Sequence, residues 1–176
     1  MKKVMLLTIF AALMMISSAA VAQTATGTLT VTATVNGSIN LVFNSDAAGV
    51  ALSSGAGTNT ATLAFGNVSA FGAVSAGIVR TTTANNFTVS SAVDVLVTKS
   101  NSASANYTLK AQLGSADAVN SWAVGGTAVT NAAQATITAT GAYASNSNFP
   151  VAITVPFTTA SGTLISNTIN YTATAN

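Results

Sequence analysis

The chain has 176 residues with five lysine or arginine and three acidic side chains, and it contains no histidine, cysteine or glutamate. These counts exclude histidine-based catalytic triads, thiolate nucleophiles and the usual zinc ligand sets. Hydrophobic residues make up 49% of the chain, too many for an intrinsically disordered protein and enough for one packed domain. We therefore expect a non-catalytic globular protein without a metal or other cofactor.

Residues 1–22 have the anatomy of a secretory signal peptide. Two lysines precede an apolar run over 4–16, and the small residues Ala20–Ala22 end the segment. The run of about 13 apolar residues is shorter than the roughly 20 that span a bilayer. We expect cleavage before Gln23, export to the periplasm and then the cell surface, and no membrane span in the mature chain.

The charges that remain after cleavage are balanced. Three cations face three anions, so the net charge is 3 − 3 = 0; these residues are Arg80, Lys99 and Lys110 against Asp46, Asp94 and Asp117. A nucleic-acid binder needs clustered cations that displace the counterions of phosphates. The scattered charges therefore predict no nucleic-acid partner.

The first mature segment, 23–36, predicts one alternating β-strand. Apolar residues occupy every second position and threonines lie between them; the apolar positions are Leu29, Val31, Ala33 and Val35. A period of two is typical of a strand with one apolar and one hydroxyl face. The sequence Asn36-Gly37-Ser38 predicts a turn, after which residues 37–176 are expected to form a β-sandwich domain.

Apolar runs separated by glycine, asparagine and serine predict the strands of that domain. They cover 39–43, 50–52, 61–65, 78–82, 87–89, 93–97, 107–113, 122–124, 135–139, 149–157 and a last strand within 162–176. In the last strand the apolar residues Ile165, Ile169, Tyr171 and Ala173 share one face. Because no segment reads as an amphipathic helix, the expected fold is an all-β sandwich.

Three details of this pattern make local predictions. The short loop after 93–97 predicts a hairpin with 107–113, and 141–148 reads as another loop. Pro150 and Pro156 predict an edge or terminal position, because proline cannot donate a ladder hydrogen bond.

The aspartates are expected to have structural roles. Asp94 alternates with buried valines and should face outward from its strand, while Asp46 and Asp117 sit in loops and should cap turns.

Residues 28–41 resemble the start of chaperone–usher pilins, the subunits of fimbriae, and are most similar to the colonisation-factor branch. In that family an alternating strand is followed by a short turn and a first domain strand. Residues 162–176 also resemble a pilin's last strand, an alternating segment after a glycine. The chain lacks the disulfide of many pilins, as members of the colonisation-factor branch do.

This resemblance implies an immunoglobulin-like β-sandwich that lacks one strand. The N-terminal extension of the next subunit would fill the resulting groove, and a periplasmic chaperone would fill it beforehand, in assembly through an usher. The implied function is a structural subunit of a pilus-like polymer that serves in adhesion, with Leu29, Val31, Ala33 and Val35 as donor residues. A self-contained secreted sandwich that binds matrix or glycan through its loops is the alternative.

Overall fold

The computed structural model describes residues 26–176, and the expected signal peptide lies outside the described residues. The chain divides into two compact units, one ending at Thr34 and one covering Val35–Asn176.

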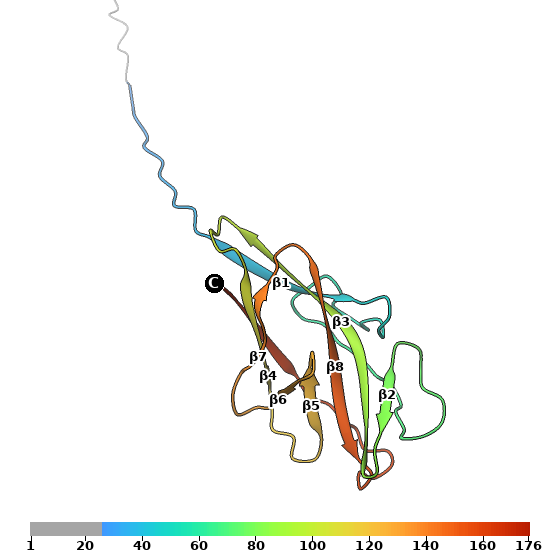
Figure 1. Ribbon diagram of the computed structural model, residues 1–176. Coiled ribbons are helices and arrows are strands. Elements are labelled where there is room, and N and C mark those ends of the chain that lie inside the picture. Colours follow the sequence, from blue (N-terminus) through green and yellow to red (C-terminus); the bar gives the residue numbers. More distant parts are fainter. Residues whose placement is uncertain (1–25) are drawn as a thin grey trace, which may run out of the picture. The chain divides into compact units, whose positions relative to one another are not determined.

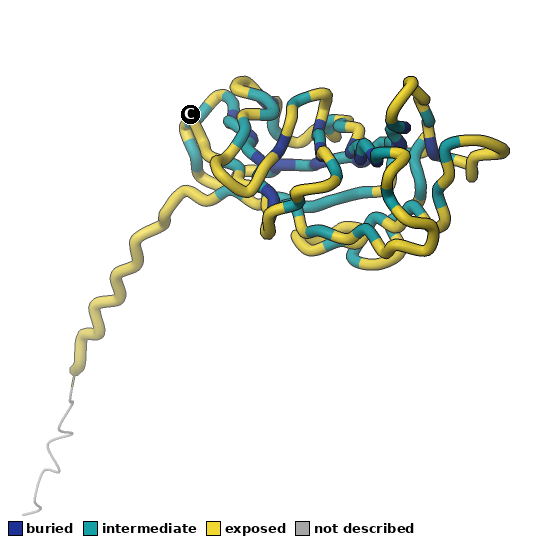
Figure 2. Tube along the Cα trace, turned by 90° about the horizontal axis from the view of Figure 1, so that it is seen from below, coloured by how far each residue is buried: buried dark blue, intermediate teal, exposed yellow. Residues whose placement is uncertain are grey.

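Residues 26–37 form no β-strand, although their alternation predicts one. All of them are exposed, and the side chains of Leu29 and Val31 are 87% and 81% exposed (Figure 2). The predicted turn is absent too, because neither Asn36 nor Gly37 adopts the positive φ of an Asn-Gly hairpin turn. Alternation specifies the two faces of a strand, but pairing needs a partner, and this segment has none among the described residues.

The remainder folds into two antiparallel β-sheets (Figure 1). The larger sheet has the order β1-β3-β8-β5-β6, with β2 beside the start of β3, and the smaller has the order β7-β4-β9. The strands are β1 Ser38–Ser45, β2 Val79–Thr82, β3 Asn86–Ser100, β4 Tyr107–Leu113, β5 Ser121–Val124, β6 Thr127–Val129, β7 Ala135–Gly141, β8 Asn146–Pro156 and β9 Ile169–Ala175. The predicted all-β sandwich is confirmed.

The core lies between the two sheets, where alternate side chains of both point inward. In β3 the odd-numbered residues from Phe87 to Val97 are buried, and in β4 those from Tyr107 to Leu113 are buried. Trp122 and Val124 of β5 add to the same apolar interior. Since the chain has no cysteine, this packing takes the place of a disulfide.

The predicted hairpin between 93–97 and 107–113 is wrong. β4 lies in the other sheet, paired with β7 and β9. The reason is that both edges of β3 are already occupied, by β1 and β2 on one side and β8 on the other. The short connection 101–106 therefore carries the chain across the core instead of back along β3.

β3 is also one strand where the pattern predicts two, at 87–89 and 93–97. Ser91 lies between them and is buried, which the sequence pattern does not indicate. Its hydroxyl oxygen accepts a hydrogen bond from the backbone N–H of Val50 at 2.7 Å. This bond satisfies the polar group inside the core, so the strand continues.

The strands predicted at 50–52 and 61–65 are absent. In the region of the chain that connects β1 to β2, the only β-type pairing among the described residues is two isolated bridges, Phe43 to Thr58 and Ser54 to Thr62. Leu52 and Leu63 still pack against the core. Five glycines between Gly55 and Gly77 have positive φ and interrupt any extended run. The strands predicted at these positions are therefore wrong, although their apolar side chains contribute to the core.

β8 is an interior strand between β3 and β5, so the edge position expected for Pro150 is wrong, while Pro156 ends the strand as predicted. The carbonyl of Pro150 accepts from the N–H of Gly125 at 2.9 Å. The nitrogen of Pro150 therefore faces β5 as well. Pro150 lies one residue beyond the stretch of β8 that pairs with β5. β8 also begins inside the predicted 141–148 loop.

The last strand is shorter than predicted. β9 begins at Ile169, and Ile165 lies in the preceding connection, half-buried against the core.

The three aspartates have the predicted structural roles. Asp94 lies on the outer face of the larger sheet, where it accepts hydrogen bonds from the side-chain amides of Asn146 and Asn148 at 3.2 and 3.1 Å. Asp46 accepts from the N–H of Ala48 at 2.8 Å and so caps a turn.

Asp117 organises the connection between β4 and β5. Its carboxylate accepts from the backbone N–H groups of Val119 and Asn120 at 3.0 and 2.8 Å, and from the indole N–H of Trp122 at 2.8 Å. Burial raises the pKa of Asp117, but the hydrogen bonds from Asn120, Trp122 and Val119 outweigh it and lower the pKa to about 2. The carboxylate thus fixes a core tryptophan from outside the core.

We predict that acid weakens the fold through Asp117. Its folded pKa of about 2 lies below the unfolded value near 3.9, so its contribution is complete above about pH 5 and is lost as the pH falls to 2. Asp117→Asn should lower the free energy of unfolding at pH 7 by about 1–3 kcal/mol and flatten its dependence between pH 5 and 2. Urea unfolding at several pH values measures this, with Asp46→Asn as the control; equal slopes for both variants would contradict it.

A second prediction concerns Gly77, which has a φ of +78° and whose added Cβ would lie 2.4 Å from the carbonyl carbon of Gly49. Gly126 has a φ of +79° and nothing within 4 Å. Gly126→Ala should therefore cost only the backbone strain of about 1 kcal/mol, whereas Gly77→Ala adds about 1–3 kcal/mol of overpacking. Equal losses of unfolding free energy for the two variants, measured by urea unfolding, would show that Gly77 and Gly49 do not pack this closely.

Candidate functional site

The two long sides of the sandwich differ. On one side, β6 continues through residues 130–134 directly into β7, and the N–H of Leu113 bonds the carbonyl of Thr130 at 3.0 Å. On the other side, the edge strands are β1 and β9, which belong to different sheets. No strand among the described residues lies between these two edges.

β1 and β9 run in opposite directions. Ser38 pairs with Ser100 and Ala175 pairs with Tyr107, and the short connection 101–106 brings these residues together. We call this the near end of the sandwich; the far end is where β3 begins, β8 ends and β9 begins (Figure 1). β1 therefore runs away from the near end and β9 runs toward it.

The free edge of β9 presents backbone groups at its odd-numbered residues. The N–H of Asn176 bonds the carbonyl of Asn106, and the N–H of Gly114 bonds the carbonyl of Thr168, so the even-numbered residues face β4. Because antiparallel residues alternate in direction, Ile169, Tyr171 and Ala173 turn their N–H and C=O groups outward. Their side chains are the half-buried ones of the strand.

The free edge of β1 is shorter. Phe43 points its backbone outward, where its N–H bonds Thr58 and its carbonyl accepts from Gly57, at 2.9 and 2.7 Å. By the same alternation Ile39 and Leu41 also face outward, and neither has a backbone partner there among the described residues. The loop around Thr58 thus occupies the end of this edge and leaves two residues open.

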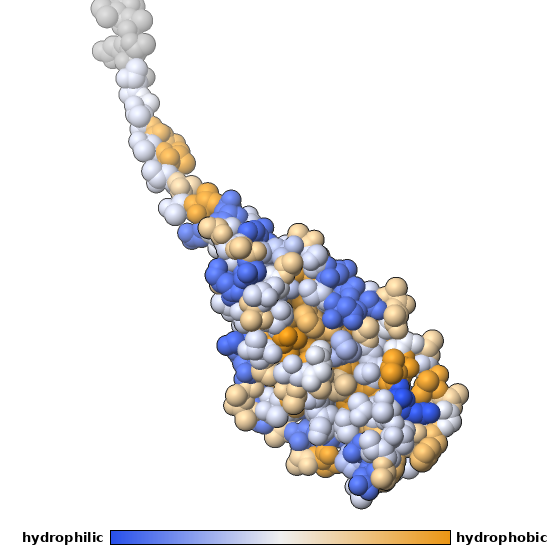
Figure 3. Space-filling view, in the orientation of Figure 1, coloured by the Kyte–Doolittle hydropathy of each residue, from blue (hydrophilic) through white to orange (hydrophobic). Residues whose placement is uncertain are grey.

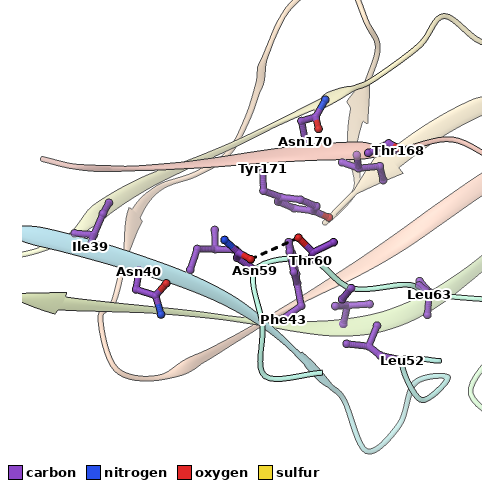
Figure 4. Close-up of a pocket in the computed structure, with 14 residues that line it drawn as sticks. Ile39, Asn40, Phe43, Leu52, Asn59, Thr60, Leu63, Thr168, Asn170 and Tyr171 are labelled. Atoms are coloured by element: carbon purple, nitrogen blue, oxygen red, sulfur yellow. Dashed lines mark hydrogen bonds between the residues drawn. The ribbon is translucent and has the colours of Figure 1, made fainter. Parts of the chain in front are cut away.

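Between the two edges lies an open groove of about 570 Å³ (Figure 4). One wall is formed by Thr168 and the start of β9 up to Tyr171, and the other by β1 continued by Asn59–Ala61 of the loop region that follows β1. The floor is apolar and is formed by Leu41, Phe43, Leu52, Leu63 and Val93. The groove therefore combines an apolar floor with unpaired backbone groups on both walls.

The aromatic rings of Tyr171 and Phe43 come from the two walls of the groove and contact each other. Their ring centroids lie 5.1 Å apart with the planes at 67°, an edge-to-face contact between the two sheets. Burial raises the pKa of the Tyr171 phenol above its usual value near 10. This contact is the closest aromatic link between the two walls.

The predicted site residues separate into two groups. Ile169, Tyr171 and Ala173 lie on the free edge of β9, and Ile165 lies outside the strand. Leu29, Val31, Ala33 and Val35 lie on the exposed segment, which has no partner strand within residues 26–176. Three further groove residues, Ile39, Leu41 and Phe43, were not predicted as site residues, although they share one face of a predicted, mostly apolar strand.

Two other features were sought among the described residues, a metal-binding cluster and a membrane-spanning helix. Residues 26–176 contain no group of three histidine, cysteine or acidic side chains placed to hold a metal ion. None of the secondary structure in that range is a helix with the length and hydrophobicity needed to cross a membrane.

Comparisons of the chain with protein-family models, with curated proteins and with solved structures find no match. The groove and the exposed segment 26–37 are therefore the features that bear on function.

We predict that the groove tyrosine makes the fold sensitive to alkali. The folded state holds the Tyr171 phenol neutral above its usual pKa near 10, whereas the unfolded chain ionises at that value, so stability falls as the pH rises past about 10. Tyr171→Phe should remove this loss. Unfolding midpoints between pH 9 and 11.5 measure it, with Tyr143→Phe as the control; parallel curves for wild type and Tyr171→Phe would disprove it.

Proposed function

We propose that this protein is a structural subunit of a fimbria-like surface polymer, assembled by donor-strand exchange. The observation that carries the proposal is the groove between β1 and β9, with unpaired backbone groups on both walls. The same chain carries an exposed alternating segment with no partner strand among the described residues. On this proposal the sandwich has the immunoglobulin-like plan with one strand missing.

The segment 28–35 has the chemistry that the groove lacks. A strand placed there would bond both edges with its backbone and turn alternate side chains onto the apolar floor. Leu29, Val31 and Val35 are 87%, 81% and 74% exposed. Burying such side chains is worth about 1.5–3 kcal/mol each, and their threonine neighbours would remain on the solvent side.

The segment is poorly suited to the groove of its own chain. A two-residue turn at Asn36-Gly37 would place Thr34 opposite Ile39, and cross-strand partners share one face. The threonines would then face the apolar floor and the valines would face water. A hairpin would also pair only with the two open residues of β1 and would run parallel to β9, so the donor is better supplied by a second copy.

The longer free edge favours one direction for the inserted strand. β9 offers Ile169, Tyr171 and Ala173, against Ile39 and Leu41 on β1. Antiparallel pairing is the more stable arrangement, so a donor should run antiparallel to β9, from the near end to the far end. The body of the donating subunit then follows at the far end of the acceptor, a head-to-tail contact that extends without closing.

The remaining parts of the proposal follow from the resemblance to pilins. The chain would be secreted, and a periplasmic chaperone would cover the groove until an usher presents the next copy. An apolar groove with open strand edges needs such cover, because unpaired edges promote aggregation. The assembled polymer would lie on the cell surface and serve in adhesion.

The donor strand can be tested by matched substitutions on its two faces. Val31→Asp places a charge on the face that would enter the groove, whereas Thr32→Asp places the same charge on the opposite face. We expect Val31→Asp to abolish the ladder of denaturant-resistant oligomers on gels, because a buried unpaired carboxylate costs several kcal/mol, and Thr32→Asp to retain it.

Two results would contradict donor-strand exchange. Equal ladders from both variants would show that the segment does not enter a groove face-on. A stable wild-type monomer that unfolds when 26–35 is deleted would show that the segment pairs within its own sandwich.

A further inference from the structure

The exposed apolar side chains of the sandwich are unevenly distributed. The large ones in the described range from Val35 onward, apart from Val35 itself, are Phe71, Val74, Val79, Val119, Phe157 and Leu164. All belong to β2 or to connections in the half of the sandwich toward the far end, and Figure 3 shows apolar residues gathered over β2 and at its lower end. None lies on the near-end connections 101–106 and 142–145.

Leu164 is the most exposed of these residues and lies closest in sequence to the groove. Its side chain is 88% exposed, and four residues later Thr168 forms part of the groove wall. The 157–168 connection that carries Leu164 is held to the connection between β4 and β5, because the Asn167 side chain donates to the carbonyl of Ser115 at 3.1 Å and accepts from the Ser115 N–H at 3.3 Å. Leu164 is thus presented from an anchored connection that leads into the groove wall at Thr168.

A donor strand that leaves the groove at this end brings its own sandwich with it. Only Asn36 and Gly37 separate Val35 from β1, and two extended residues span roughly 7 Å. Gly37 lies against the loop 101–106, since a Cβ at Gly37 would be 2.8 Å from the carbonyl oxygen of Asn101. The near-end loop of the donating copy must therefore arrive within a short distance of the acceptor's far-end connections.

We propose that consecutive copies make a second contact, body to body, in which the 157–168 connection of the acceptor packs Leu164 against the 101–106 loop of the next copy. This inference rests on the proposed donor-strand pairing. The loop suits a leucine, because Ala103 and Ala105 are exposed and present only methyl groups. The two segments also carry charges of opposite sign. Lys99 lies beside the 101–106 loop, and Asp117 lies in the 114–120 connection, which the hydrogen bonds between Ser115 and Asn167 join to the 157–168 connection.

The test separates the body contact from the groove. Polymers of wild type, Leu164→Asp and Val79→Asp are compared for the rate at which denaturant-resistant ladders fall apart to monomers. Val79 is the matched control, because it is also an exposed apolar residue, at 66%, but it lies on β2 and does not line the groove. We expect dissociation about tenfold faster for Leu164→Asp and unchanged for Val79→Asp.

A second measurement isolates the groove alone. A synthetic peptide of residues 26–35 is bound to the full chain carrying Val31→Asp, which cannot donate, with and without Leu164→Asp. Equal peptide affinity in both, together with faster ladder dissociation, supports the body contact. Ladders of Leu164→Asp as persistent as those of Val79→Asp would overturn it and leave donor exchange intact, and so would peptide binding weakened by Leu164→Asp, which would assign Leu164 to the groove. Absence of wild-type ladders and of peptide binding would instead remove the proposed function, and the body contact with it.

Discussion

The hydrogen-bonding phase of β9 is the constraint on which the rest of the molecule's behaviour depends. Because its even-numbered residues bond β4, the odd-numbered ones must direct their backbone groups into the space beside β1. The side chains of those same residues face the core. A single alternation thus creates an unpaired edge and an apolar floor together, and the strand that we propose to enter the gap would satisfy both.

The chain meets this constraint with few other means of stabilisation. It has no disulfide, and its three aspartates are used in turns and on the outer sheet face. Stability therefore depends on packing between the sheets, with the edge-to-face contact of Phe43 and Tyr171 the main aromatic link across the open side. An open side of this kind is costly to leave exposed, and this cost supports the proposed assembly with a second copy.

Local pattern predicted the elements better than their neighbours. Residues 107–113 alternate clearly, residues 39–43 are mostly apolar, and both are strands as predicted. Asp117 caps its connection, because strand pattern and side-chain capping depend only on nearby residues. The partner of 107–113 was wrong, since it depends on which edges of β3 were already occupied. Leu52 and Leu63 are inward-facing without being strands, because glycines with positive φ break the ladder but not the packing.

The sequence by itself determined the all-β class, the alternation of apolar residues and threonines in 28–35 and the alternation of the last strand, because each is a period of two along the chain. Only the tertiary structure decided that β1 and β9 become edges facing each other, since this depends on contacts between residues more than a hundred positions apart. The groove between them therefore exists only once the two sheets have packed, whereas the alternating segment 28–35 can be read from the sequence.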